Sequence, residues 1–189
     1  MKLKRIVILT VCVFLLSACV SACGNRVDDL APMMQLRQDL AKADGCSFLA
    51  EITADYGDRI YNFTLKCTTN ATGDAYFEVM KPESIAGISG RVSPIGGKLE
   101  FDDQVLLFSG LTQGQITPVI APWLMIKAIT GGYISAVNND MVVTINDTFS
   151  GDELLTLLTL QENARPSYCE LFYKNRRILS LHISDFCIL

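Results

Sequence analysis

The chain has 189 residues, and half of them are hydrophobic. Its 20 acidic and 16 basic side chains give a formal net charge of −4 at pH 7, and this balance argues against a nucleic-acid partner and against electrostatic docking on anionic lipid headgroups. The length beyond a short leader fits one domain, predicted here at residues 30–189, and the sequence has no internal repeat or second long apolar run.

The N-terminus has the pattern of a secretory leader. Three basic residues within the first five positions precede an uncharged apolar run over residues 6–16, which is too short to span a bilayer. Small residues then lead directly into Cys19, as in the sequences that the bacterial lipoprotein pathway cleaves and lipidates. We therefore expect a lipoprotein signal peptide at residues 1–18 and a short polar tether at residues 19–29.

Two cysteines compete as the site of lipidation. A leucine lies three positions before Cys19, at the end of the apolar run, and this favours Cys19. Cleavage before Cys23 would leave an even number of cysteines, as oxidising compartments favour. Cys19 is the predicted site and Cys23 the alternative. The diacylglycerol group on the lipidated cysteine, with acyl chains such as palmitate, would be a two-chain anchor that holds the protein on the outer face of a cell membrane.

The first elements of the mature chain are a helix and a hairpin. Apolar residues at helical spacing predict an amphipathic helix over residues 30–44. Alternating apolar residues then predict two strands joined at residues 55–58, with Asp55 paired with Asp58. That register places Cys46 directly opposite Cys67, where either a cross-strand disulfide or two neighbouring thiols would fit.

Further strands follow, and one apolar helix interrupts them. Residues 118–130 contain a single charge and end at Gly131-Gly132, which predicts a helix that is buried on most sides or lies over an apolar surface. Near the C-terminus, a turn at residues 174–178 would place Leu181 opposite Leu171. The other expected strands are 75–79, 85–92, 98–101, 105–108, 141–146, 154–161, 168–173 and 178–184.

These elements predict a mainly β protein of the α+β class. About nine to eleven antiparallel strands would form one large sheet, and a sheet of that size tends to curl or close. At that curvature the helix at residues 118–130 can fill its mouth. A helix that simply fills the core accounts for the same periodicity, and both interpretations remain open from the sequence.

The order of elements resembles the superfamily of bacterial lipoprotein-sorting proteins. The segments that carry the resemblance are residues 77–82 (FEVMKP), 97–101 (GKLEF) and 164–166 (ARP), within a similarity over residues 30–186. The family includes outer-membrane lipoprotein carriers and receptors and related lipoproteins of Gram-positive and mycobacterial cells. The family's lid-locking arginine is assigned to no position here.

The resemblance implies an antiparallel, incompletely closed half-barrel whose apolar cavity accepts acyl chains beneath a helical lid, with residues 118–130 as part of that lid. Under that implication, the candidate cavity residues are Phe48, Ile52, Tyr61, Phe63, Leu65, Phe77, Val79, Leu99, Phe101, Trp123, Ile126 and Ile129.

No constellation typical of catalysis or metal binding is present in the sequence. Its one histidine, His182, alternates with Leu181 and Ile183, as expected of a strand residue at the surface or with a satisfied hydrogen bond. We therefore expect no catalytic residue, no metal and no cofactor.

Two functions follow as hypotheses. The first is a membrane-anchored envelope lipoprotein that binds a lipid or acyl-type ligand and handles lipids or lipoproteins, at the outer membrane if the source is Gram-negative. The second is a non-enzymatic scaffold for an envelope protein partner.

Overall fold

The structure is a computed structural model that describes residues 30–102, 104–108 and 116–189. Residues 32–189 form one unit, and the description below concerns that unit by itself. It contains two α-helices and eleven strands, with no helix in the described residues long and apolar enough to cross a membrane. The predicted signal peptide, the tether, Cys19 and Cys23 lie outside the described residues.

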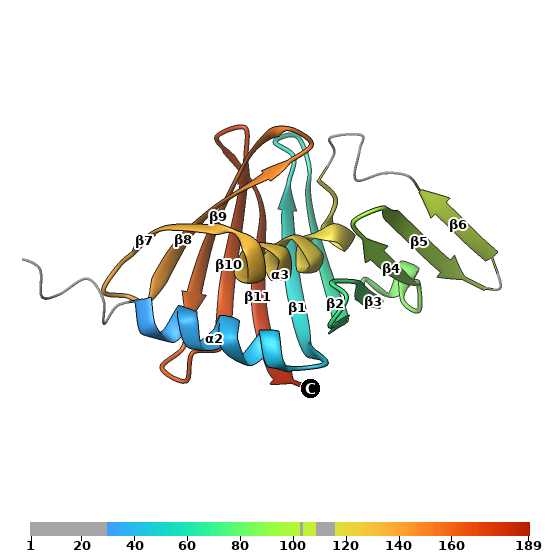
Figure 1. Cartoon of the computed structure of the whole chain (residues 1–189). Coiled ribbons are helices and arrows are strands. Elements are labelled where there is room, and N and C mark those ends of the chain that lie inside the picture. Colours follow the sequence, from blue (N-terminus) through green and yellow to red (C-terminus); the bar gives the residue numbers. More distant parts are fainter. Residues whose placement is uncertain (1–29, 103, 109–115) are drawn as a thin grey trace, which may run out of the picture. The chain divides into compact units, whose positions relative to one another are not determined.

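The chain folds in two strand series separated by helical segments (Figure 1). The first series follows helix α2 and ends at strand β6, and the second begins after helix α3 and ends at β11. The elements are α2 (Ala31–Lys42), β1 (Gly45–Asp55), β2 (Ile60–Asn70), β3 (Ala75–Lys81), the 3-10 helix η3 (Glu83–Ile85), β4 (Ser89–Ser93), β5 (Gly96–Phe101), β6 (Gln104–Phe108), the 3-10 helix η5 (Pro118–Ile120), α3 (Ala121–Gly131), β7 (Tyr133–Val137), β8 (Val142–Phe149), β9 (Asp152–Leu160), β10 (Pro166–Tyr173) and β11 (Arg176–Ile188).

All eleven strands belong to one antiparallel sheet, in the order β6-β5-β4-β3-β2-β1-β11-β10-β9-β8-β7. Each series is a meander, and the two are joined by the pairing of the first strand with the last, in which Ile52 lies opposite Leu181. The sheet is open, because β6 and β7 are at its two ends. The predicted fold class, an antiparallel half-barrel with two helices, is confirmed.

The core lies on one face of this sheet. Residues of β1 alternate between buried and partly exposed, as a strand with one buried face requires. Helix α3 contacts β8 and β10, and η5 contacts β1, so the helical segment crosses that face (Figure 1). The buried side chains of the central strands include Phe48, Ala50 and Ile52 of β1, Leu154 and Leu158 of β9, Leu171 of β10, and Leu179 and Leu181 of β11.

The predicted pairing of the first hairpin is wrong by two residues. Asp55 pairs with Ile60, and the amide of Tyr56 donates to the carbonyl of Arg59 at 3.0 Å, so the loop is longer than the sequence suggested. Cys46 consequently lies opposite Thr69, and Cys67 lies opposite Phe48. Both cysteines are free thiols in the structure, so of the two alternatives left open by the sequence the disulfide is not formed.

The last hairpin differs from its prediction in the opposite direction. Lys174 and Asn175 both have positive φ angles and form a two-residue turn, and a bulge between Leu171 and Phe172 then places Leu171 opposite Leu179. A two-residue turn of this kind matches the twist of the flanking strands. The pairing error is two residues in the first hairpin and also two over residues 168–171 of the last, and an even error leaves the predicted buried face unchanged.

Two further segments differ from expectation. The strand predicted over residues 85–92 begins only at Ser89, because Gly87 adopts φ of 86° in the loop that precedes it. Strand β7 was not predicted at all. It is short, lies at the end of the sheet and has mostly exposed side chains, so it carries little alternation.

Candidate functional site

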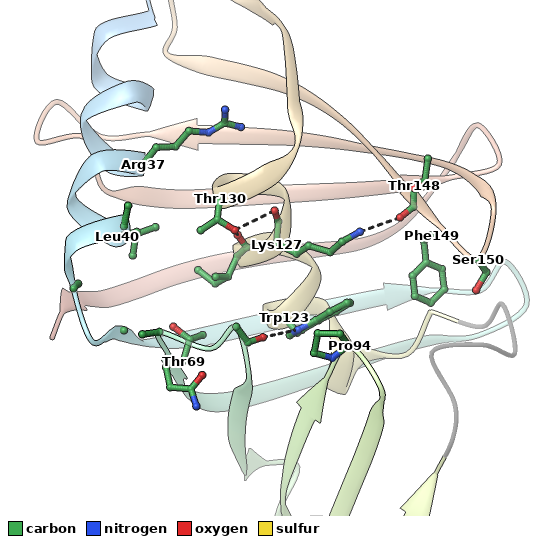
Figure 2. A pocket seen from close by; sticks show the side chains of 17 residues that line it. Arg37, Leu40, Thr69, Pro94, Trp123, Lys127, Thr130, Thr148, Phe149 and Ser150 are labelled. Atoms are coloured by element: carbon green, nitrogen blue, oxygen red, sulfur yellow. Dashed lines mark hydrogen bonds between the residues drawn. The ribbon is translucent and has the colours of Figure 1, made fainter.

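A well-formed hollow lies between the two helices and the ends of several strands. It has a volume of about 800 Å³ and is bounded by α2, α3, the ends of β1, β2 and β8, and the β2–β3, β4–β5 and β8–β9 turns (Figure 2). This volume falls within the usual range for small-molecule sites. Its lining residues are Arg37, Leu40, Ala41, Ala43, Gly45, Thr69, Asn70, Ala71, Gly73, Pro94, Trp123, Ile126, Lys127, Thr130, Thr148, Phe149 and Ser150.

Helix α3 has two distinct faces. One face consists of Leu124, Met125, Ala128 and Ile129, none of which has any exposed surface. The other consists of Trp123, Ile126, Lys127 and Thr130, which line the pocket at the i, i+3, i+4, i+7 spacing of one helical stripe. The side of α3 toward the core is therefore filled, and the open space lies on its other side.

Trp123 fixes the first turn of α3 against the sheet. Its indole Nε1 donates a hydrogen bond to the carbonyl of Gly73 at 2.9 Å, in the turn between β2 and β3 (Figure 2). The ring itself is 8% exposed and forms part of the pocket wall. A buried tryptophan normally satisfies its N–H in this way, leaving its apolar surface available for packing.

Arg37 of α2 binds the opposite end of α3. Its Nε donates to the carbonyl of Ile129 at 2.6 Å, and its Nη2 donates to the carbonyl of Gly132 at 2.5 Å. The last carbonyls of a helix have no partner within the helix and carry a negative partial charge, so a guanidinium is well suited to them. Partial burial lowers the pKa of Arg37 from its ordinary value, although an arginine remains charged. Arg37 thereby joins the two helices that border the pocket.

Lys127 supplies a third attachment of α3. Its ammonium lies 2.8 Å from a carboxylate oxygen of Asp147, and its Nζ also donates to the carbonyl of Thr148 at 3.1 Å. Asp147 and Thr148 belong to β8, which packs beside the helix. Arg37 and Lys127 are the two charged residues of the pocket lining, and both are cationic.

The predicted cavity residues occupy several different environments. Trp123 and Ile126 line the pocket, whereas Ile129 is on the filled face of α3. Tyr61 and Phe101 are 40% and 51% exposed. Phe63 and Leu99 pack at the border of the core. The remaining five members of the predicted set are buried in the core: Phe48, Ile52, Leu65, Phe77 and Val79.

The structure therefore does not gather the predicted residues around one hollow. Ile52 and Phe63 line a second, shallower depression of about 540 Å³, together with polar side chains that include Glu51 and His182. The pocket residues that the sequence did not indicate come mainly from turns and from α2. Leu40 is on the predicted apolar stripe of its helix, but no local pattern distinguishes Arg37 from other surface arginines.

His182 packs against an aromatic ring, and three of the four cysteines in the described residues are buried. The ring of His182 contacts the ring of Tyr168, with their centroids 4.6 Å apart. Burial raises the pKa of the Cys46, Cys67 and Cys169 thiols, which disfavours the reactive thiolate. No group of acidic, cysteine and histidine side chains in the described residues has the arrangement of a metal site.

Solved structures of other proteins are similar to this fold. A putative outer membrane lipoprotein-sorting protein domain from Vibrio parahaemolyticus is 11% identical, with a TM-score of 0.50 over 82% of this chain and 90% of that chain. A LolA superfamily protein from Nitrosomonas europaea is 12% identical, with a TM-score of 0.47 over 82% and 93% of the two chains. The Mycobacterium tuberculosis lipoprotein LppX is 11% identical, with a TM-score of 0.38 over 82% and 94%.

The chain thus has the fold of a lipoprotein-sorting domain, and the resemblance predicted from the sequence is confirmed at the level of the fold. No protein-family model and no curated protein sequence matches the chain.

Proposed function

We propose that this protein is a non-enzymatic envelope lipoprotein that binds an acyl-type apolar ligand in the pocket between α2 and α3. The observation that carries the proposal is the pocket-facing stripe of α3, where Trp123 and Ile126 present apolar surface to a hollow of about 800 Å³. Leu40 and Phe149 extend this apolar surface from neighbouring elements. Ligand sites are typically concave and mostly apolar, with a few polar groups that set orientation.

The anchor is a second part of the same proposal. A diacylglycerol group on Cys19, or on Cys23, would hold the domain to the outer face of the membrane after removal of the leader. The test is mass spectrometry of the N-terminal peptide from the native protein. A peptide that begins with an acylated Cys19 supports the proposal, and an unmodified peptide that begins at Met1 contradicts it.

Ligand binding is tested by native mass spectrometry of the full chain purified gently from its own envelope. We expect a noncovalent apolar mass, distinct from the covalent anchor, that is released on denaturation. Trp123→Ala should reduce its occupancy because the substitution removes pocket wall. Tyr133→Ala is the matched control, since Tyr133 is an exposed aromatic residue away from the pocket. A clean apo mass that takes up no added phospholipid would contradict the proposal.

One observation favours the scaffold function as a second candidate. Strand β6 is at one end of the sheet order, and its Val105, Leu106 and Leu107 are 57%, 61% and 74% exposed. Exposed apolar strands at a sheet edge are common sites of association. In crosslinking from intact membranes, Leu107→Ser should then lose an envelope partner without changing the lipid content, whereas the ligand-binding function predicts the lipid content to depend on Trp123.

A further inference from the structure

We propose that the pocket between α2 and α3 selects amphiphiles with an anionic headgroup, a carboxylate or a phosphate, and that Arg37 binds this headgroup. The inference rests on the proposed function and specifies the chemistry of its ligand. It depends on the charge of the pocket lining, on the hydrogen-bond donors that Arg37 has left, and on the position of Arg37 relative to the apolar wall.

The pocket lining is cationic although the chain as a whole is acidic. Arg37 and Lys127 are its charged residues, and none of the 17 lining residues is an aspartate or glutamate. The charge of Lys127 is matched by Asp147, whose carboxylate is 2.8 Å away. Arg37 has no carboxylate partner among the described residues. The unmatched charge of the pocket is therefore that of Arg37.

Arg37 also retains hydrogen-bonding capacity. A guanidinium has five N–H donors, and the bonds of Arg37 to α3 come from Nε and Nη2. Its Nη1 donates to no residue in the part of the chain that the structure describes. The C-terminus of a helix carries only about half a negative charge, so these carbonyls offset the guanidinium incompletely. A carboxylate or phosphate oxygen at Nη1 would satisfy the remaining donors and the remaining charge.

The position of Arg37 suits an elongated ligand with one charged end. Figure 2 shows Arg37 on α2 at one end of the pocket, with Thr130, Lys127 and then Trp123 following along α3 away from it. A ligand with its headgroup at Arg37 could extend its alkyl chain along this face of α3, past Ile126 to Trp123. Partial burial of the Arg37 charge strengthens an interaction with an anion because less water screens it.

The test uses the full chain in phosphatidylcholine nanodiscs and a matched pair of photoreactive probes. One probe is a diazirine-bearing hexadecanoic acid, and the other is the alcohol with the same chain and diazirine. Labelled peptides are mapped by mass spectrometry, with labelling of the segment that contains Trp123 as the readout. We expect the acid to label this segment about tenfold more than the alcohol, the ratio typical of a hydrogen bond to a charged group.

Variants of Arg37 separate the charge from the shape of the pocket. Arg37→Gln should reduce labelling by the acid to the level of the alcohol in the same variant. Because the readout is the acid-to-alcohol ratio within each variant, a change in pocket shape that affects both probes alike does not alter it. Arg37→Lys keeps the charge and should keep the preference for the acid. The control is Arg165→Gln, because Arg165 also binds α2, through Asp39 at 3.3 Å, but does not line the pocket.

The outcomes distinguish the inference from the function on which it rests. Equal labelling of the pocket by both probes, or a preference that persists in Arg37→Gln, would overturn the anionic selectivity and leave ligand binding intact. Absence of labelling by both probes would overturn the proposed function itself. Excess inorganic phosphate should not displace the acid. Complete displacement would show a simple anion site and overturn the assignment to amphiphiles.

Discussion

The indole of Trp123 and the carbonyl of Gly73 are joined by a 2.9 Å hydrogen bond between residues 50 positions apart in the chain. This bond connects α3 to the turn that follows β2, whereas the C-terminal end of α3 is bound by Arg37 from α2. The helix is thus attached at one end to the first strand series and at the other to the N-terminal helix. Its stability and the shape of the pocket are expected to depend on both attachments.

Trp123→Phe tests the first attachment. Phenylalanine retains most of the apolar wall but cannot donate to Gly73, so we expect a loss of about 1 kcal/mol of unfolding free energy from the missing hydrogen bond. Ligand occupancy should change little. Urea unfolding measures the stability, and native mass spectrometry measures the occupancy. A loss of ligand as large as that of Trp123→Ala would show that the hydrogen bond, not the apolar surface, shapes the pocket.

Arg37→Gln tests the second attachment. Glutamine cannot reach and cap the last carbonyls of α3 with a charged group, and the loss of charge-assisted hydrogen bonds should cost about 2 kcal/mol. Amide hydrogen exchange of residues 121–131 should accelerate by an order of magnitude or more, while exchange in β9 and β10 stays near that of the wild type. Arg165→Gln removes a half-exposed pair with Asp39 and should have little effect. Equal acceleration in both variants would argue against a specific role for Arg37.

Gly131 and Gly132 provide a matched pair at the end of α3. A Cβ at Gly132 would lie 2.4 Å from the side chain of Ile145 and 2.8 Å from the carbonyl of Ala128, whereas a Cβ at Gly131 meets nothing within 4 Å. We expect Gly132→Ala to destabilise the protein by about 1–3 kcal/mol through overpacking. Gly131→Ala should change stability by less than about 1 kcal/mol. Thermal unfolding of the two variants checks this, and similar midpoints would contradict the close packing at Gly132.

The buried thiols predict both a labelling pattern and a pH dependence. Among the four cysteines of the described residues, Cys187 is exposed and the other three are buried, so a thiol reagent should modify Cys187 first in the native protein. Peptide mapping after a short exposure tests this order. Rapid modification of Cys46 or Cys67, or a disulfide between them in the native protein, would contradict the structure.

Stability should also decrease at alkaline pH. Burial raises the pKa of Cys46, Cys67 and Cys169 above their ordinary value of 9.0, so above that pH the unfolded chain releases protons that the folded chain retains. Proton release by the unfolded state alone lowers the free energy of unfolding as pH rises. Denaturant titrations at pH 8 and pH 10 measure the effect. The triple substitution of these cysteines by alanine should weaken the dependence.

Much of the fold could be predicted because its periodicities are local. The spacing of Met33, Leu36 and Leu40 indicated α2, and the apolar run at residues 118–130 indicated the helical segment that the structure divides into η5 and α3. The registers of the strands were harder to predict from the sequence, because they depend on the conformation of the turns. The two-residue turn of Lys174 and Asn175, with positive φ angles, and a bulge after Leu171 together shifted the last hairpin from its predicted pairing.

Only part of the candidate site could be predicted from the sequence. Trp123 and Ile126 belong to a helix whose unusual apolar character is visible in the chain, and both line the pocket. Which side of that helix faces open space depends on the packing of Leu124, Met125 and Ala128 against the sheet, which a helix apolar on nearly all sides does not reveal. Arg37 could not be predicted, because it donates hydrogen bonds to carbonyls of a helix end 92 positions away in the chain, and every helix end has such carbonyls.

The pairing of β1 with β11 has a consequence for the order of assembly. Cys46 lies opposite Ile188, so the first and the last strand of the domain are neighbours in the middle of the sheet. Contacts between such distant positions make folding slow, because the intervening chain must be ordered before they form. A polypeptide that crosses a membrane N-terminus first would remain without its central strand until its final residues emerged. The slow folding would therefore keep the chain unfolded, and able to pass through a translocation channel, during export.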